Sequence, residues 1–134
     1  MITAKHCKEI SLSVTNDVGI LAKITKIITE KGINILAACA WVENANKGII
    51  HLVTEDNLRV MDALRAHNYS PEELASIAVE LNHKPGMLNR VCTKLSTAHV
   101  GIHYLYVSAP INEDQCLLVL STEDNDKALI ALND

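Results

Sequence analysis

One short device occurs twice in this chain and constrains its fold more than any other feature. "TNDVGILAKITKII" begins at Thr15 and "NHKPGMLNRVCTKL" begins at Asn82; each is a polar turn, a glycine and then apolar residues at helical spacing. The two glycines, Gly19 and Gly86, are 67 positions apart (86 minus 19). Self-similarity at a fixed period is typical of repeated structural units. The sequence therefore predicts two copies of one unit.

The repeat extends to the end of the sequence. At a shift of 67 several apolar positions coincide: Ile10 with Ile77, Leu21 with Leu88, Ile24 with Val91, and Ile35 with Ile102. One extra residue in the second half changes the shift to 68, and "TEDN" at 54–57 then falls on "TEDN" at 122–125. We expect two domains, 1–72 and 73–134, each near the lower size limit for an independent core.

Each half changes its periodicity in the same order. Residues 10–15 and 77–82 alternate apolar and polar side chains, as a strand with one buried face does, and the residues after each glycine have helical periodicity. Two strands and a short helix follow, and the candidate N-caps of that helix are Asn57 in the first half and Asp124 or Asn125 in the second. The order predicts two tandem ferredoxin-like (βαββαβ) units, an α+β fold with antiparallel sheets and helices on one face.

The last strand of this unit is expected in the first half only. Residues 69–75 would form it and lead directly into the next strand, whereas the second unit would lack its last strand. Backbone N–H and C=O groups beside residues 77–81 would then be unpaired, and such strand edges recruit neighbouring chains unless a local rearrangement covers them. We therefore expect a homo-oligomer, most simply a homodimer.

Composition excludes several classes of partner. The chain has a net charge of -4 and a pI of about 5.8, so it lacks the basic stripe that nucleic acid or an anionic membrane surface would require. Its longest apolar run is the eight residues 35–42, far below the roughly 20 that span a bilayer, and residues 1–10 have no signal-like apolar core. Four widely spaced cysteines are typical of reduced packing thiols. A cytoplasmic location is expected.

The turn before each first helix limits the chemistry. Neither "TNDVG" nor "NHKPG" contains a cysteine for a metal or an arginine for a phosphate, and aromatic residues make up only 3 % of the chain. No Ser/His/Asp or Cys/His arrangement can be assembled from the sequence. We expect no catalytic residues, no metal and no cofactor. What remains is a helix start, which attracts a small carboxylate through its free N–H groups, or which serves only as a chain reversal.

These residues resemble a known family. "TNDVGILAKITKIITEKGINI" and "NHKPGMLNRVCTKLSTAHVGIHYLY" are similar to the first halves of ACT domains, small modules that typically bind amino acids and regulate metabolic enzymes. The resemblance covers nearly the whole chain as two tandem copies. It implies a free amino acid as ligand and a metabolic enzyme as a regulated partner.

The resemblance also implies where the ligand binds. In family members that bind amino acids, two modules associate through their second strands, and the ligand lies between the first loop of one module and the start of the second strand of the other. Two reciprocal sites are therefore implied. Site one joins Asn16, Asp17, Gly19 and Ile20 to Gly101 and Ile102, and site two joins His83, Lys84, Gly86 and Met87 to Asn34 and Ile35.

The second copy departs from the family pattern. His83 replaces the loop asparagine, and "HVGI" at 99–102 replaces "GINI" at 32–35, so site one lacks an asparagine on its strand side. Gly32 can adopt the left-handed conformation that ends a helix, whereas His99 would be strained there. Lys84 would attract a ligand carboxylate where Asp17 would oppose it, so we expect site two to bind more tightly.

The sequence thus predicts a non-enzymatic regulatory protein that binds a free amino acid. The alternative is a structural or adaptor module that has kept the dimerising sheets and lost the ligand. The sequence does not indicate which amino acid binds.

Overall fold

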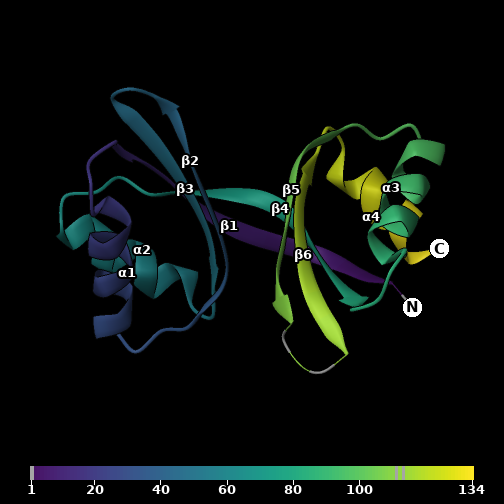
Figure 1. Cartoon of the computed structure of the whole chain (residues 1–134), viewed down its shortest axis with the longest axis horizontal. Helices are drawn as coiled ribbons and strands as arrows, with labels where there is room; N and C mark the ends of the chain where they lie inside the picture. Colours follow the sequence, from purple (N-terminus) through teal and green to yellow (C-terminus); the bar gives the residue numbers. More distant parts are fainter. Residues whose placement is uncertain (1, 111, 113) are drawn as a thin grey trace. The chain divides into compact units, whose positions relative to one another are not determined.

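The computed structural model describes residues 2–110, 112 and 114–134, which form six strands and four helices (Figure 1). In chain order they are β1 (Thr3–Thr15), α1 (Ile20–Glu30), β2 (Ile35–Asn44), β3 (Lys47–Thr54), α2 (Asn57–Ala66), β4 (Glu72–Asn82), α3 (Met87–Thr97), β5 (Ile102–Pro110), β6 (Gln115–Thr122) and α4 (Asn125–Asn133). Among the helices of these residues, none is both long and apolar enough to cross a membrane.

The chain divides into two compact units. One is Lys8–Leu74, called the first module below; the other, the second module, joins the residues up to Cys7 to Ala75–Asp134. The division expected at residue 72 lies close to the break after Leu74, but the first residues of the chain group with the second module. Two strands, β1 and β4, therefore contribute to both modules.

Each module has the strand order of a ferredoxin-like fold. The order is β2-β3-β1-β4 in the first module and β1-β4-β6-β5 in the second. In the first module β3 pairs antiparallel with β1 and β2; in the second, β6 pairs antiparallel with β4 and β5. The predicted α+β fold is confirmed.

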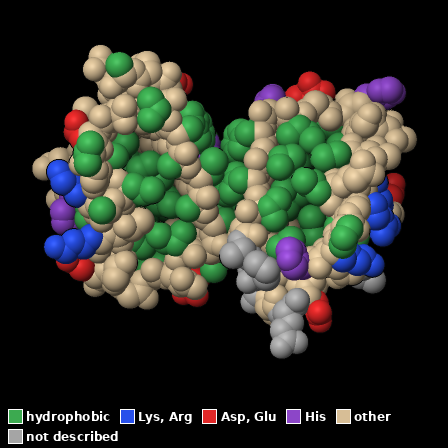
Figure 2. Space-filling view, in the orientation of Figure 1, with side chains coloured by type: hydrophobic (Ala, Val, Ile, Leu, Met, Phe, Trp, Pro, Cys, Tyr) green, Lys and Arg blue, Asp and Glu red, His purple; other side chains and the backbone are tan. Residues whose placement is uncertain are grey.

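Each module buries one hydrophobic core between its sheet and its helices. Alternate strand residues meet the apolar stripes of two helices, as the two periodicities predict. The first core includes Ile10, Leu12, Ile24, Ile28, Leu52, Val60 and Leu64, and the second includes Ile77, Val79, Val91, Leu95, Leu118, Leu120 and Leu132. Hydrophobic side chains also gather on the visible surface of each module (Figure 2).

The repeated "TEDN" motif begins the second helix of each module in the same way. Asp56 caps α2 by accepting a hydrogen bond from the Arg59 backbone N–H (3.2 Å), and Asp124 caps α4 through the Lys127 N–H (3.1 Å). The expectation for Asp124 is confirmed, while that for Asn57 is wrong. Asn57 is the first residue of α2, and its side-chain oxygen instead accepts hydrogen bonds from the N–H and the hydroxyl of Thr54.

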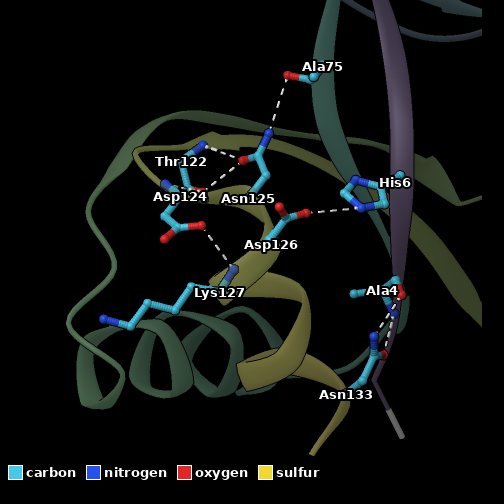
Figure 3. A network of polar contacts seen from close by, with 9 residues as sticks. All are labelled: Ala4, His6, Ala75, Thr122, Asp124, Asn125, Asp126, Lys127 and Asn133. Atoms are coloured by element: carbon cyan, nitrogen blue, oxygen red, sulfur yellow. Dashed lines mark hydrogen bonds and ion pairs between the residues drawn. The ribbon is translucent and has the colours of Figure 1, made fainter.

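The open edge expected beside residues 77–81 is absent, because β1 lies next to β4 in the strand order. No strand follows α4 among the described residues, but the amino-terminal part of β1 takes the position of the fourth strand in the second module. Figure 3 shows this part of β1 beside α4. Asn133 donates to the Ala4 carbonyl and accepts from the Ala4 N–H, both at 2.9 Å, and His6 lies 3.3 Å from Asp126.

Candidate functional site

The turn before the first helix has the same backbone in both modules. Gly19 (φ 85°) and Gly86 (φ 91°) stand at the N-caps of α1 and α3 in the left-handed region, and neither helix start has a side-chain cap. A Cβ added at either glycine would meet no atom within 4 Å. Glycine is therefore required for its dihedral angles and not for close packing. The Ile20 and Met87 N–H groups donate to the Asp17 and Lys84 carbonyls (3.2 and 3.4 Å), and no side chain caps the N–H groups that follow them in the first turn.

Matching hydrogen bonds fix both loops. The Asn16 N–H donates to the Asn46 carbonyl (3.2 Å), and the His83 N–H donates to the Asp114 carbonyl (2.6 Å). These acceptors lie in the hairpins between β2 and β3 and between β5 and β6, so each loop is tied to the tip of its own hairpin. The predicted repeat is thus reproduced in the backbone contacts of the candidate site.

The loop and the start of the second strand lie at opposite ends of each module. In the first module Lys47 of β3 pairs with Thr15 beside the loop, whereas Thr54, seven residues further along, pairs with Ile35. Seven residues of strand span about 24 Å at about 3.4 Å each. The second module has the same arrangement, because Gln115 pairs with Asn82 and Thr122 with Ile102. One module alone therefore cannot bring its loop to the start of its own second strand.

The twelve predicted site residues fall into two groups. The first module holds Asn16, Asp17, Gly19 and Ile20 at its loop end and Asn34 and Ile35 at its other end. The second module holds His83, Lys84, Gly86 and Met87 at its loop end and Gly101 and Ile102 at its other end. Met87 is buried, at 3 % exposure, and belongs to the core of the second module, so its side chain is not at the surface of the loop.

The two second-strand starts differ in what surrounds them. Asn34 is exposed, and its carbonyl accepts from the Glu55 N–H (3.1 Å). At the equivalent place in the second module, the Gly101 N–H donates to the Glu123 carboxylate (2.9 Å), and a Cβ at Gly101 would approach that carboxylate to 3.1 Å. The side chain of Glu123 thus occupies the space beside Gly101. Glu55 is the equivalent glutamate of the first module, so the difference at this place is that Gly101 replaces the Asn34 side chain and the Glu123 carboxylate lies against it.

Each loop borders a hollow, and the two hollows differ. Beside the first loop, a hollow of about 170 Å³ lies between the start of α1 and the β2–β3 hairpin, with Asn16, Ile20, Leu21 and Val42 in its lining. Beside the second loop, a hollow of about 380 Å³ is lined by four polar or charged residues: Asn82, His83, Lys84 and Asp114.

The reasoning from sequence missed Asp114. The repeat offers a signal for it, because the shift of 68 places Asp114 opposite Asn46, the hairpin residue whose carbonyl binds the first loop.

A buried polar group on the first sheet was also missed. The Ser11 hydroxyl lies 3.0 Å from Nε2 of His51, whose Nδ1 lies 3.2 Å from the Glu9 carboxylate; Glu9 and His51 are 0 % and 5 % exposed. Serine, histidine and a carboxylate recur together in hydrolases, but His51 is 40 residues from Ser11 in the chain, so no local motif connects them. Here Ser11 lies within β1 opposite His51 of β3, where the strand N–H groups bond within the sheet and cannot form an oxyanion hole. The group is therefore a buried polar contact between two paired strands.

The cysteines and histidines do not form a reactive or metal-binding centre in the part of the chain that the structure describes. Burial, and next the charge of Glu9, raises the pKa of the Cys39 thiol, which favours the unreactive protonated form. Among the described residues there is no group of three His, Cys, Asp or Glu side chains that could hold a metal ion.

Comparison with known proteins gives a family and several similar folds. The family model of the ACT domain pair matches residues 5–133. The crystal structure of protein BT0572 from Bacteroides thetaiotaomicron is similar over 97 % of this chain and 88 % of that one, with a TM-score of 0.86 and 27 % identity. A search of curated proteins finds no match.

Aspartate kinase structures have the same fold at lower identity. The regulatory subunit of aspartate kinase from Thermus thermophilus, in its ligand-free form, matches 98 % of this chain and 94 % of its own, with a TM-score of 0.69 and 15 % identity. Aspartate kinase from Clostridium acetobutylicum matches 98 % of this chain with 33 % of its own, at a TM-score of 0.55 and 16 % identity. The match of the family model over nearly the full length is decisive: this chain belongs to the family of ACT domain pairs.

Proposed function

We propose that the protein is a non-enzymatic regulatory module that binds a free amino acid at its turn-to-helix loops. The observation that carries the proposal is the hollow beside the second loop. An amino acid has one carboxylate and one ammonium group, and this hollow has Lys84 for the first and Asp114 for the second. The uncapped start of α3 adds N–H groups that favour the carboxylate.

We propose that each reciprocal site takes its loop from one module and its second strand from another. The reason is that the loop and the start of the second strand lie at opposite ends of a single module. Site two combines His83, Lys84, Gly86 and Met87 with Asn34 and Ile35, and site one combines Asn16, Asp17, Gly19 and Ile20 with Gly101 and Ile102. We propose that site two binds more tightly. Asn34 can donate to a carboxylate and accept from an ammonium group, whereas the Glu123 carboxylate beside Gly101 repels the ligand carboxylate.

We also propose that the protein forms a homodimer. The open edge expected beside residues 77–81 is not the reason, because β1 lies next to β4 there. β2 stands at the end of the strand order of its module, and its Leu36 side chain, which does not line the hollow beside the first loop, is exposed. Such a strand edge favours association with a second copy. Light scattering at high protein concentration would give twice the mass of the chain, and a monomer there would remove this part of the proposal.

A thermal-shift screen with the common amino acids tests the function. A ligand at 100 times its Kd adds about 2.7 kcal/mol to the free energy of unfolding and raises Tm by several degrees. The Asn34→Ala variant should bind that ligand roughly ten- to a hundredfold more weakly, because a hydrogen bond to a charged group is worth about 1.5–3 kcal/mol. Asn16→Ala is the matched control and should matter less.

Two results would contradict the proposal. If no amino acid raises Tm, an adaptor role without ligand is favoured instead. If Asn34→Ala binds as tightly as the parent in calorimetry, site two is removed from consideration. A metabolic enzyme is the proposed partner; the similar aspartate kinase from Clostridium acetobutylicum is an allosteric enzyme.

A further inference from the structure

The hollow beside the first loop is small and lies within one module. It has a volume of about 170 Å³ and lies between the first turn of α1 and the β2–β3 hairpin. At about 30 Å³ per water molecule, this is the space of roughly five or six waters. The volume suits a side chain of a few carbon atoms and excludes a nucleotide.

Its lining is almost entirely apolar. The side chains include Val14, Ile20, Leu21, Val42 and Ile49, and Asn16 is the one polar lining residue among those that the structure describes. No charged residue lines the hollow within that part of the chain, so burying a charged ligand group there would be strongly unfavourable.

The apolar lining is accessible and not sealed in the core. Leu21 is 43 % exposed and Val42 is 60 % exposed, and Trp41, also in the lining, is 42 % exposed. Asn16 and the uncapped start of α1 lie at the same hollow and offer polar groups beside the apolar surface. This is the combination expected for a pocket that orients a small amphiphilic ligand.

We propose that this hollow receives the side chain of an aliphatic amino acid of about the size of leucine. The inference rests on the proposed function, since it assigns a ligand class to the first loop. The ligand's carboxylate and ammonium groups stay at Asn16 and the first turn of α1, and its aliphatic carbons enter the apolar lining. The hollow beside the second loop, with His83, Lys84 and Asp114, does not share this selectivity.

The test is a calorimetric series with glycine, alanine, valine, leucine, asparagine and lysine on the full chain and on its Asn34→Ala variant, in which site two is weakened so that binding at the first loop is measured apart from it. Burying a methylene group is worth about a fourfold change in Kd, so affinity should rise stepwise from glycine to leucine. Leucine and asparagine have the same number of side-chain heavy atoms and a similar shape. Leucine should bind at least tenfold more tightly than asparagine, and lysine should bind more weakly than leucine.

Two variants tie the selectivity to this hollow. Val42→Thr keeps the shape and adds a hydroxyl to the lining, so the ratio of leucine to asparagine affinity should fall roughly threefold or more. Ala40→Asp places a carboxylate in the lining and should weaken leucine binding more than tenfold. Val107→Thr, at an exposed β5 residue outside the hollow, is the control and should leave the ratio unchanged.

The outcomes separate the two proposals. If none of the common amino acids binds, the proposed function fails and this inference with it. If amino acids bind but asparagine or lysine equals leucine, or if Val42→Thr and Ala40→Asp leave the ratio unchanged, the aliphatic selectivity is wrong and the proposed function stands.

Discussion

The two modules share one backbone plan but complete it in different ways. In the first module the covalent chain leads from α2 through residues 67–71 into β4, its fourth strand. In the second module the fourth strand is the start of β1, which is tied to α4 by Asn133 and by the pair His6 and Asp126. A segment that is remote in sequence can therefore take the position of a strand in a fold. Contacts of side chains then hold that segment in place where the covalent chain does not lead into it.

The sheets also differ on the face away from the helices. The first module carries Glu9, Ser11 and His51 there, and the repeat places Ser76, Ala78 and Val119 at the equivalent positions of the second. One face thus contains a buried carboxylate in contact with a buried histidine, while the other is nearly apolar. The four predictions below use these differences, from the largest expected effect to the smallest.

Replacing His51 tests the buried polar group. His51→Val should lower the free energy of unfolding by about 3–5 kcal/mol, because it removes the contact of His51 Nδ1 (3.2 Å) from the buried Glu9 carboxylate. A triple variant has the residues of the second module at these positions: Glu9→Ser, Ser11→Ala and His51→Val. Its free energy of unfolding should fall by less than that of His51→Val alone. Urea unfolding measures both. Ser13→Ala, at an exposed position of the same strand, is the control, and a loss below 0.5 kcal/mol for His51→Val would contradict the prediction.

Replacing Asn133 tests the tie between α4 and β1. Asn133→Ala removes two hydrogen bonds to Ala4 and should lower the free energy of unfolding by about 1–3 kcal/mol. Asn89→Ala, at an exposed position of α3, is the matched control and should be close to neutral. If both variants unfold at the same urea concentration as the parent, the tie does not stabilise the second module.

The ends of α1 and α3 differ in one residue. Gly32 (φ 68°) and His99 (φ 57°) are both left-handed, so His99 adopts the conformation in which we expect a side chain to be strained. The His99→Gly variant should relieve about 1–2 kcal/mol of backbone strain. The greater freedom of glycine in the unfolded chain offsets about 0.4–1 kcal/mol of that gain, so the free energy of unfolding should rise by about 0.5–1 kcal/mol. Gly32→Ala should cost about 1 kcal/mol through its backbone alone, since no atom lies within 4 Å of its Cβ. Opposite shifts in Tm are expected, and shifts of the same sign would be inconsistent with this explanation.

The thiol of Cys39 should give the smallest effect. Its pKa is raised in the folded protein, so the folded state favours the protonated form. That stability is present below the unfolded pKa of about 8.5 and is lost as the pH rises through the folded value. As the pH rises above about 8.5, the Cys39→Ala variant should lose stability less steeply than the parent. Equal slopes in unfolding experiments across that range would show that the shift is negligible.

Much of the fold could be predicted from local pattern. The shift of 67 identified both loops, the helices that follow them and the left-handed residues 32 and 99. The apolar periods identified the core residues, because a strand repeats every two residues and a helix every 3.6. The candidate loops followed from the same pattern, whereas Asp114 and the group around His51 did not, because their partners come from other strands.

The sequence by itself determined that this chain folds as two ferredoxin-like modules with matched turn-to-helix loops, since those features depend on residues close together in the chain. The tertiary structure alone decided which segment completes the second sheet. Ala4 and Asn133 are 129 residues apart, and no periodicity within either segment specifies that pairing. It is decided by which free strand satisfies the backbone groups beside β4 and covers the apolar core of the second module.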